Sequence, residues 1–163
     1  MARFALETVI AAPPTAVFTA SLDPELHLRS MAAHSETMLE APAGGVFTEG
    51  STVTWRARHF GVSFRLRSRV FDIDPPHGFR DRQISGPFSE FLHVHSFTKH
   101  PQGTLMRDEV AFRSPLGPVG RVVDRLFMRR YLLGVIRERN RTLMAELSHD
   151  GDSKHDHAAD SDS

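Results

Sequence analysis

Between Phe4 and Arg113, apolar and polar residues alternate in a series of short runs, which is the period of strands that bury one face. Turn sequences rich in glycine and proline separate the runs, for example at residues 74–78 and 100–103. The pattern predicts seven strands, at residues 4–10, 33–41, 51–60, 62–73, 78–85, 89–99 and 104–113.

Helical signals flank this strand-rich region. Pro14 and Pro24 suit the first turns of two short helices between the first two strands. From Val119 to Leu147 apolar residues recur at helical spacing, which predicts one long helix. Its expected core-facing stripe is Val122, Val123, Leu126, Phe127, Leu133, Ile136, Leu143 and Leu147. The predicted fold class is therefore α+β, a curved seven-stranded antiparallel sheet around a long C-terminal helix.

The composition indicates one folded domain followed by a tail. The chain has 163 residues, of which 40% are hydrophobic and 25% charged, an ordinary balance for one globular core. Residues 148–163 contain five aspartates among Ser, His, Gly and Ala and have no apolar periodicity. We expect a ligand-binding domain at residues 1–147 and a disordered acidic tail at 148–163.

The sequence contains no cysteine, which excludes disulfides, thiolate nucleophiles and thiolate metal sites. Glu7 interrupts the N-terminal apolar run, so that run does not read as a signal peptide. No later stretch has the length of a membrane span. We therefore expect a cytoplasmic protein.

The hairpin formed by residues 89–99 and 104–113 predicts which side chains face the core. If its turn pairs Lys99 with Thr104, His95 lies opposite Asp108 and His93 lies opposite Val110. The same face carries apolar residues, whereas the other face is too charged to be buried. His93, His95 and Asp108 are thus expected to point inward.

A second hairpin, at residues 51–73, divides its side chains in the same way. Trp55, His59 and Phe64 fall on the inner face. The outer face carries five arginines, namely Arg56, Arg58, Arg65, Arg67 and Arg69. These arginines are expected to be exposed to solvent.

The order of elements and several segments resemble the START-related helix-grip ligand-binding superfamily (SRPBCC), including its polyketide cyclase/dehydrase and coenzyme Q-binding relatives. The segments are AAPP at 11–14, VTWRAR at 53–58, GPFSEFLHVHSF at 86–97, MRDEVAF at 106–112 and PLGP at 115–118. The last two strand segments are similar to an uncharacterised bacterial branch. No Rieske cluster motif is present, so the oxygenase branch of the superfamily does not fit.

The resemblance implies a cavity between the sheet and the C-terminal helix for lipids, quinones or polyketides, and no cofactor. The residues expected to line it are Trp55, His59, Phe64, Phe91, His93, His95, Phe97, Met106, Asp108, Phe112 and Phe127. Superfamily members include carriers, receptors, cyclases and dehydratases, and a fold alone does not decide among these activities. The leading hypothesis is binding or transfer of a small hydrophobic molecule. The alternative is a cyclase or dehydratase acting in the same cavity.

Three interpretations of the inward polar residues stay open. His93, His95 and Asp108 match a facial two-histidine, one-carboxylate metal site. His95 and Asp108 would equally suit a buried hydrogen-bonded pair, which we favour because histidine is often buried when it is satisfied. The same pair would also suit general-base catalysis, since a carboxylate raises the basicity of a neighbouring imidazole. His95 and Asp108 are therefore the catalytic candidates, and no metal is expected.

The arginine-rich outer face raises the question of nucleic acid or membrane binding. Aromatic rings for stacking bases hardly alternate with these arginines, so we expect no nucleic-acid partner. The predicted long helix adds further arginines and few acids, so peripheral contact with an anionic membrane is a secondary hypothesis. Nothing in the sequence indicates an oligomeric state.

Overall fold

The computed structural model of the chain describes residues 1–32, 36–59, 61–115 and 117–156. Its strands are β1 (Ala2–Ile10), β2 (Thr37–Glu40), β3 (Thr52–His59), β4 (Val62–Asp74), β5 (Gly78–Ser85), β6 (Glu90–His100) and β7 (Gly103–Arg113). They form one antiparallel sheet in the order β1-β7-β6-β5-β4-β3-β2. Each neighbouring pair except β1 and β7 is consecutive along the chain, as short turns between antiparallel strands allow.

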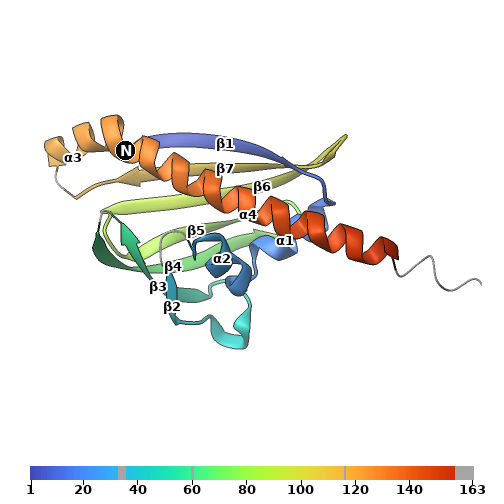
Figure 1. Cartoon of the computed structure of the whole chain (residues 1–163). Helices are drawn as coiled ribbons and strands as arrows, with labels where there is room; N and C mark the ends of the chain where they lie inside the picture. The colour runs from blue at the N-terminus through green and yellow to red at the C-terminus, as the bar shows by residue number, and fades with distance from the viewer. Residues whose placement is uncertain (33–35, 60, 116, 157–163) are drawn as a thin grey trace, which may run out of the picture.

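The helices are α1 (Pro14–Ser21), α2 (Pro24–Ser30), the short 3-10 helix η2 (Ala43–Gly45), α3 (Gly117–Val123), the π-helical turn η3 (Asp124–Met128) and α4 (Arg129–Asp156). Both α1 and α2 begin with proline, and Asp23 caps α2 by accepting hydrogen bonds from the backbone N–H groups of Glu25 and Leu26. Figure 1 shows α4 lying diagonally across one face of the curved sheet, with α1 and α2 on the same side. The predicted helix-grip fold is confirmed.

The strand register also agrees with the sequence. His95 is the register partner of Asp108, and His93 is the partner of Val110, as the alternation predicted. In the β3–β4 hairpin, Trp55 pairs with Leu66. Because side chains alternate between the two faces of a strand, this register fixes which residues meet α4.

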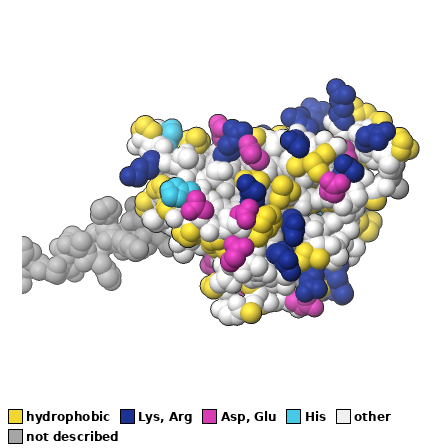
Figure 2. Space-filling view, turned by 180° about the vertical axis from the view of Figure 1, so that it is seen from behind, with side chains coloured by type: hydrophobic (Ala, Val, Ile, Leu, Met, Phe, Trp, Pro, Cys, Tyr) yellow, Lys and Arg dark blue, Asp and Glu magenta, His cyan; other side chains and the backbone are white. Residues whose placement is uncertain are grey.

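The sheet separates an apolar interior from a polar outer face. One core cluster lies under α1, α2 and the C-terminal half of α4 and includes Val17, Trp55, Phe97, Met106 and Leu143. A second cluster at the other end includes Phe4, Val110, Phe112 and Ile136. The five arginines predicted on the outer face are exposed, and Figure 2 views the molecule from that side. None of the described helices is long and apolar enough to cross a membrane.

Several boundaries differ from the predictions. The strand predicted at 33–41 is shorter, since β2 begins at Thr37, and residues 33–35 of that prediction lie outside the described part of the chain. The predicted long helix is divided by η3, which has π rather than α hydrogen bonding. Helix α4 continues to Asp156, so residues 148–156, expected to be disordered, are helical, and 157–163 lie outside the described residues.

The first part of the predicted core stripe is wrong. Val122, Val123, Leu126 and Phe127 are exposed, whereas Ile136 and Leu143 are buried as predicted. The stripe was correctly assigned to one helical face, but in α3 and η3 that face is turned to solvent. The residues on the buried side of this segment are Gly120 and Asp124.

Candidate functional site

The inner face of β6 carries two adjacent imidazoles. His93 and His95 are two residues apart on one strand, so both point to the same side, and their ring centroids are 3.8 Å apart. Both side chains are buried, at 5% and 4% exposed. The ring of Phe79 from β5 stacks on His95 at 4.2 Å between centroids. The imidazoles therefore lie in an apolar, aromatic layer where unpaired polar atoms would be costly.

Asp108 from β7 supplies a carboxylate on one side of the two rings. Its side chain is fully buried, and its Oδ1 lies 2.8 Å from His93 Nε2, with hydrogen-bond geometry. The same oxygen lies 2.9 Å from His95 Nδ1, but that nitrogen has no hydrogen-bond partner because the angles are unsuitable. Asp108 thus bonds to the diagonal histidine rather than to its register partner.

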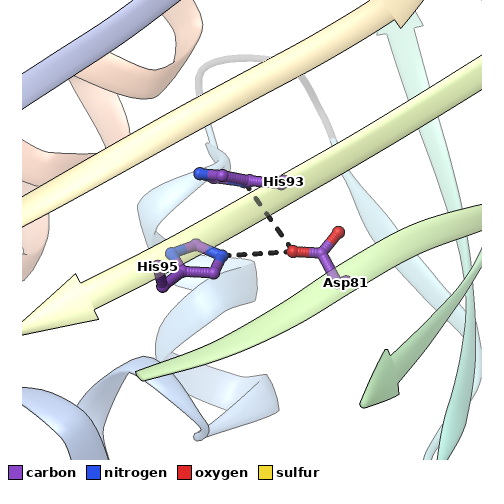
Figure 3. A group of neighbouring side chains, drawn as sticks. All are labelled: Asp81, His93 and His95. Atoms are coloured by element: carbon purple, nitrogen blue, oxygen red, sulfur yellow. Dashed lines mark hydrogen bonds and ion pairs between the residues drawn. The ribbon is translucent and has the colours of Figure 1, made fainter. Parts of the chain in front are cut away.

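Asp81 from β5 supplies a second carboxylate on the opposite side (Figure 3). Its Oδ2 lies 3.1 Å from His95 Nε2, within hydrogen-bond distance, and 3.7 Å from His93 Nδ1. Strand β5 approaches β6 very closely here, since a β-carbon at Gly78 would lie 2.3 Å from the carbonyl oxygen of His95. The side chain of Asp81 is 22% exposed, so this carboxylate is the accessible part of the group.

Helix α4 completes the group with Asn140 and Arg139. Asn140 Nδ2 donates to Asp108 Oδ2 at 2.7 Å and contacts Thr8 Oγ1 at 3.1 Å. Arg139 Nη1 lies 3.6 Å from Asp108 Oδ1 and donates to Asn140 Oδ1 at 3.3 Å. These contacts tie the helix to β1 and β7 through polar atoms. We refer to Asp81, His93, His95, Asp108, Arg139 and Asn140 as the buried polar cluster.

The two histidines respond to this environment in opposite directions. Burial lowers the pKa of His93, and the neighbouring His95 lowers it further, so the neutral imidazole is favoured. Burial also acts to lower the pKa of His95, but its contacts with Asp108 and Asp81 outweigh this effect and raise the pKa overall. Of the two imidazoles, His95 is therefore the one whose protonated form the surroundings favour.

Both carboxylates are held in the charged form. Burial alone would raise the pKa of Asp108, yet its contacts with His93 and His95 hold that pKa well below its usual value. The pKa of Asp81 is lowered as well, because the bond with His95 and the charge of His93 outweigh burial. The negative charges of the two carboxylates are offset by Arg139 and by the protonated form of His95 that its surroundings favour, which stabilises the cluster inside the protein.

Three side chains of the cluster have the spacing of metal ligands, but they are not the three that the sequence suggested. Asp81, His93 and His95 each offer one ligand atom, and these three atoms lie within 4.8 Å of one another. In this set Asp81 replaces Asp108 as the carboxylate. Asp108 instead contacts the far side of both imidazoles, the place of a residue that orients metal ligands.

The other predicted lining residues fall into three environments. Phe97, Met106 and Phe112 are buried in the two core clusters, and Trp55 is buried against His27, with 4.6 Å between the ring centroids. Phe64 and Phe91 are half-buried, as is His59, whose Nδ1 contacts Tyr131 Oη from α4. Phe127 is 51% exposed and lies on η3, away from the buried polar cluster. The structure thus groups His93, His95 and Asp108 and leaves Phe127 outside.

Sequence reasoning did not identify Asp81, Arg139 or Asn140. The signal for Asp81 was present, because it follows the apolar Phe79 by two residues and so shares its strand face. The signal for Asn140 was its position four residues after Ile136 and three before Leu143, which places it on the apolar stripe. Arg139 carries the same signal, being three residues after Ile136 and four before Leu143, but charged side chains are rarely fully buried, so its place in the cluster was not expected.

Two hollows bear on ligand binding. An open one of about 420 Å³ lies around β2, β3 and the start of β4 and is lined by Thr37, Arg56, Ala57, Arg58, Gly61 and Ser63. A second one, of about 10 Å³, lies beside the buried polar cluster and is lined by Ala20, Ser21, Leu26, His27, Ser30, Arg139 and Leu143. The second holds about one water molecule. A larger ligand would have to displace side chains there.

A protein-family model described as polyketide cyclase / dehydrase and lipid transport matches residues 1–148. This range coincides closely with the part of the chain in which the sequence resembles the helix-grip superfamily. No protein of curated function matches the sequence.

Solved structures share the fold at low sequence identity. TTHA0849 from Thermus thermophilus superposes with a TM-score of 0.74 and 16% identity, covering 91% of this chain and 99% of that one. Ms6760 from Mycobacterium smegmatis gives a TM-score of 0.69 and 18% identity, with 91% and 92% covered. The di-domain ARO/CYC StfQ from the steffimycin biosynthetic pathway gives 0.71 and 14%, with 91% of this chain and 52% of that chain covered. At these identities the likeness concerns the fold alone.

Proposed function

Because this chain belongs to the polyketide cyclase / dehydrase and lipid transport family, we propose that it binds a small, mostly apolar molecule between the sheet and α4. The observation that carries the proposal is a buried, charge-balanced cluster on an inner face that is otherwise aromatic and aliphatic. Ligand sites commonly combine an apolar lining with a few convergent polar groups of this kind. Perturbed pKa values, as found here for four side chains of the cluster, are also enriched at functional sites.

The chemistry of the cluster favours a ligand with an apolar body and a carbonyl or hydroxyl group. A ligand carbonyl oxygen would accept from His95 Nε2–H in place of Asp81, and the accessible carboxylate of Asp81 would accept from a ligand hydroxyl group. Quinones, lipids and polyketide-like molecules all fit this description. Phe79, Phe97 and Met106 line the same layer and would contact the apolar body.

A second candidate function is a cyclase or dehydratase, supported by the opposite pKa shifts of His93 and His95. Environments that separate the pKa values of neighbouring groups suit one of them as an acid and the other as a base. In a dehydration, neutral His93 would take a proton from the carbon next to a carbonyl. Protonated His95 would give its proton to the departing hydroxyl, which leaves as water.

Native mass spectrometry of the protein purified from its own host tests the binding proposal. A co-purifying lipid, quinone or polyketide supports it. Absence of any adduct, together with no binding of an added quinone, fatty acid or poly-ketone by isothermal titration calorimetry, would overturn it.

The variant His95→Gln separates the carrier from the enzyme. In a carrier it should weaken ligand binding only modestly, because glutamine keeps a hydrogen-bond donor. In a cyclase or dehydratase it should abolish turnover of an added poly-ketone and leave binding largely intact. The matched control is His77→Gln, which changes an exposed histidine paired with Asp74 and should alter neither measurement.

A further inference from the structure

The segment formed by α3 and η3, residues 117–128, presents an apolar stripe to solvent. Its five large apolar side chains are between 38% and 69% exposed, namely Val119, Val122, Val123, Leu126 and Phe127. Their spacing of three, one, three and one residues is the pattern that a helix normally turns towards a protein core. Contiguous exposed apolar surface of this kind marks an interaction site.

The stripe cannot simply turn inward, because the opposite side of the segment is fixed to the end of β7. Asp124 is 2% exposed and accepts hydrogen bonds from the backbone N–H and the hydroxyl of Ser114. Gly120 packs against the same residue, and a β-carbon at Gly120 would lie 3.2 Å from the Ser114 carbonyl oxygen. The outward direction of the stripe is therefore built into the fold.

The exposed charges of the segment and of the following turn are all positive. Arg121, Arg125, Arg129 and Arg130 are exposed, and Figure 2 shows dark blue and yellow side chains gathered together at the upper right, the end of the molecule that carries α3. The acid of this stretch, Asp124, is buried. Among the residues that the structure describes, no carboxylate forms an ion pair with any of these four arginines.

We propose that α3 and η3 dock the protein on the surface of an anionic lipid bilayer. The apolar stripe would enter the headgroup layer, and the four arginines would meet lipid phosphates. A second copy of this chain fits the surface poorly, because pairing the stripes would bring two sets of four arginines together. Nucleic acid would satisfy the arginines but would not bury the exposed apolar surface of the stripe.

The position of α3 and η3 suggests that a docked protein would take up its ligand at this end. Unlike the docking itself, this inference rests on the proposed function. Phe127 stacks with Tyr131, with 6.4 Å between ring centroids, and Tyr131 contacts His59 at the end of β3. The half-buried Phe64 lies beside His59, with 6.3 Å between ring centroids. The docked end of the molecule is thus the end where inner aromatic residues are incompletely covered, a suitable entrance for a lipid-soluble ligand.

Co-sedimentation with vesicles tests the docking proposal. Wild-type protein should bind vesicles of equal parts phosphatidylglycerol and phosphatidylcholine, bind pure phosphatidylcholine weakly, and release as salt is raised. Leu126→Ser with Phe127→Ser should reduce binding at least tenfold, and Arg121→Gln with Arg125→Gln should reduce it by a similar factor and flatten the salt dependence. The control is Val46→Ser with Val62→Ser, since both valines are more than half exposed elsewhere and should leave binding unchanged.

Two outcomes would overturn the proposal: wild-type protein that fails to bind anionic vesicles, or variants that bind them as well as wild type. Analytical ultracentrifugation then identifies the alternative, since a dimer abolished by Leu126→Ser with Phe127→Ser would assign the stripe to self-association. A failure of the docking proposal can be told apart from a failure of the ligand-binding proposal. A ligand found by native mass spectrometry with no vesicle binding would refute docking and leave the ligand-binding proposal standing.

Discussion

His93 and Asp108 are joined across β6 and β7 by a 2.8 Å contact between Nε2 and Oδ1, although they are not register partners. In the register His93 faces Val110, and Asp108 faces His95. Diagonal neighbours on antiparallel strands are within reach of long side chains. One fully buried carboxylate thereby contacts both imidazoles, and the behaviour of each histidine depends on the other.

Replacing Asp108 should change the protonation of His95. We expect Asp108→Asn to lower the pKa of His95, because the substitution removes a negative charge that stabilises the imidazolium. NMR titration of the imidazole resonances measures this shift. Asp72→Asn is the control, since Asp72 is exposed and pairs with Arg80. An unchanged pKa of His95 would show that Asp81 alone holds its proton.

Truncating Asp108 should destabilise the fold. Asp108→Ala leaves Asn140 Nδ2 and His93 Nε2 without their acceptor inside the protein. An unsatisfied buried polar group costs about 1–3 kcal/mol, and we expect the free energy of unfolding to fall by an amount of this order. Urea denaturation measures the change. Glu90→Ala should cost much less, because the exposed ion pair of Glu90 with Arg113 contributes little, and equal losses in the two variants would contradict the burial argument.

The two histidines should respond oppositely to pH. The pKa of His95 is raised above 6.5, so its contribution to stability is complete below pH 6.5 and is lost as the pH rises through the folded value. His95→Gln should therefore cost more free energy of unfolding at about pH 5.5 than at about pH 9. The difference has the opposite sign if His95 is neutral in the folded protein at both pH values, because the unfolded chain would then bind a proton at about pH 5.5 that the folded protein does not.

For His93 the contribution to stability changes with pH in the opposite direction. Its pKa is lowered below 6.5, so the unfolded chain binds a proton that the folded protein does not, and acid destabilises the fold through this residue. His93→Gln should cost less at about pH 5.5 than at about pH 9. Guanidinium denaturation of both variants at both pH values tests the pair of signs. Exchanged signs would show that the proton is on His93, and a common sign would contradict opposite pKa shifts.

The C-terminal helix should be essential only as far as its core contacts extend. A chain that ends at Arg113 lacks Ile136, Asn140 and Leu143, and we expect it to lose cooperative unfolding in circular dichroism. A chain that ends at Ser148 keeps these residues and should have a nearly unchanged melting temperature. A folded monomer ending at Arg113 would mean that the sheet is stable without α4.

The β6–β7 hairpin shows how much local sequence determines. The turn at residues 100–103 and the period of two in the flanking strands were enough to pair His95 with Asp108 and to turn both inward. The long apolar period and the helix-starting prolines likewise predicted the α+β class and the order of elements. Period and turn length act between residues close in sequence, so the chain itself carries this information.

The sequence could not decide which distant side chains share the site, or which way a helical face points. Asp81 reaches His95 through the pairing of β5 with β6, and Asn140 reaches Asp108 through the crossing of α4 over the sheet. The residues from Val122 to Phe127 were predicted to share one core-facing helical face, but the contact between Asp124 and Ser114 holds that face towards solvent. Periodicity identifies residues that lie together, whereas exposure depends on which other elements pack against them, and tertiary structure alone settles that.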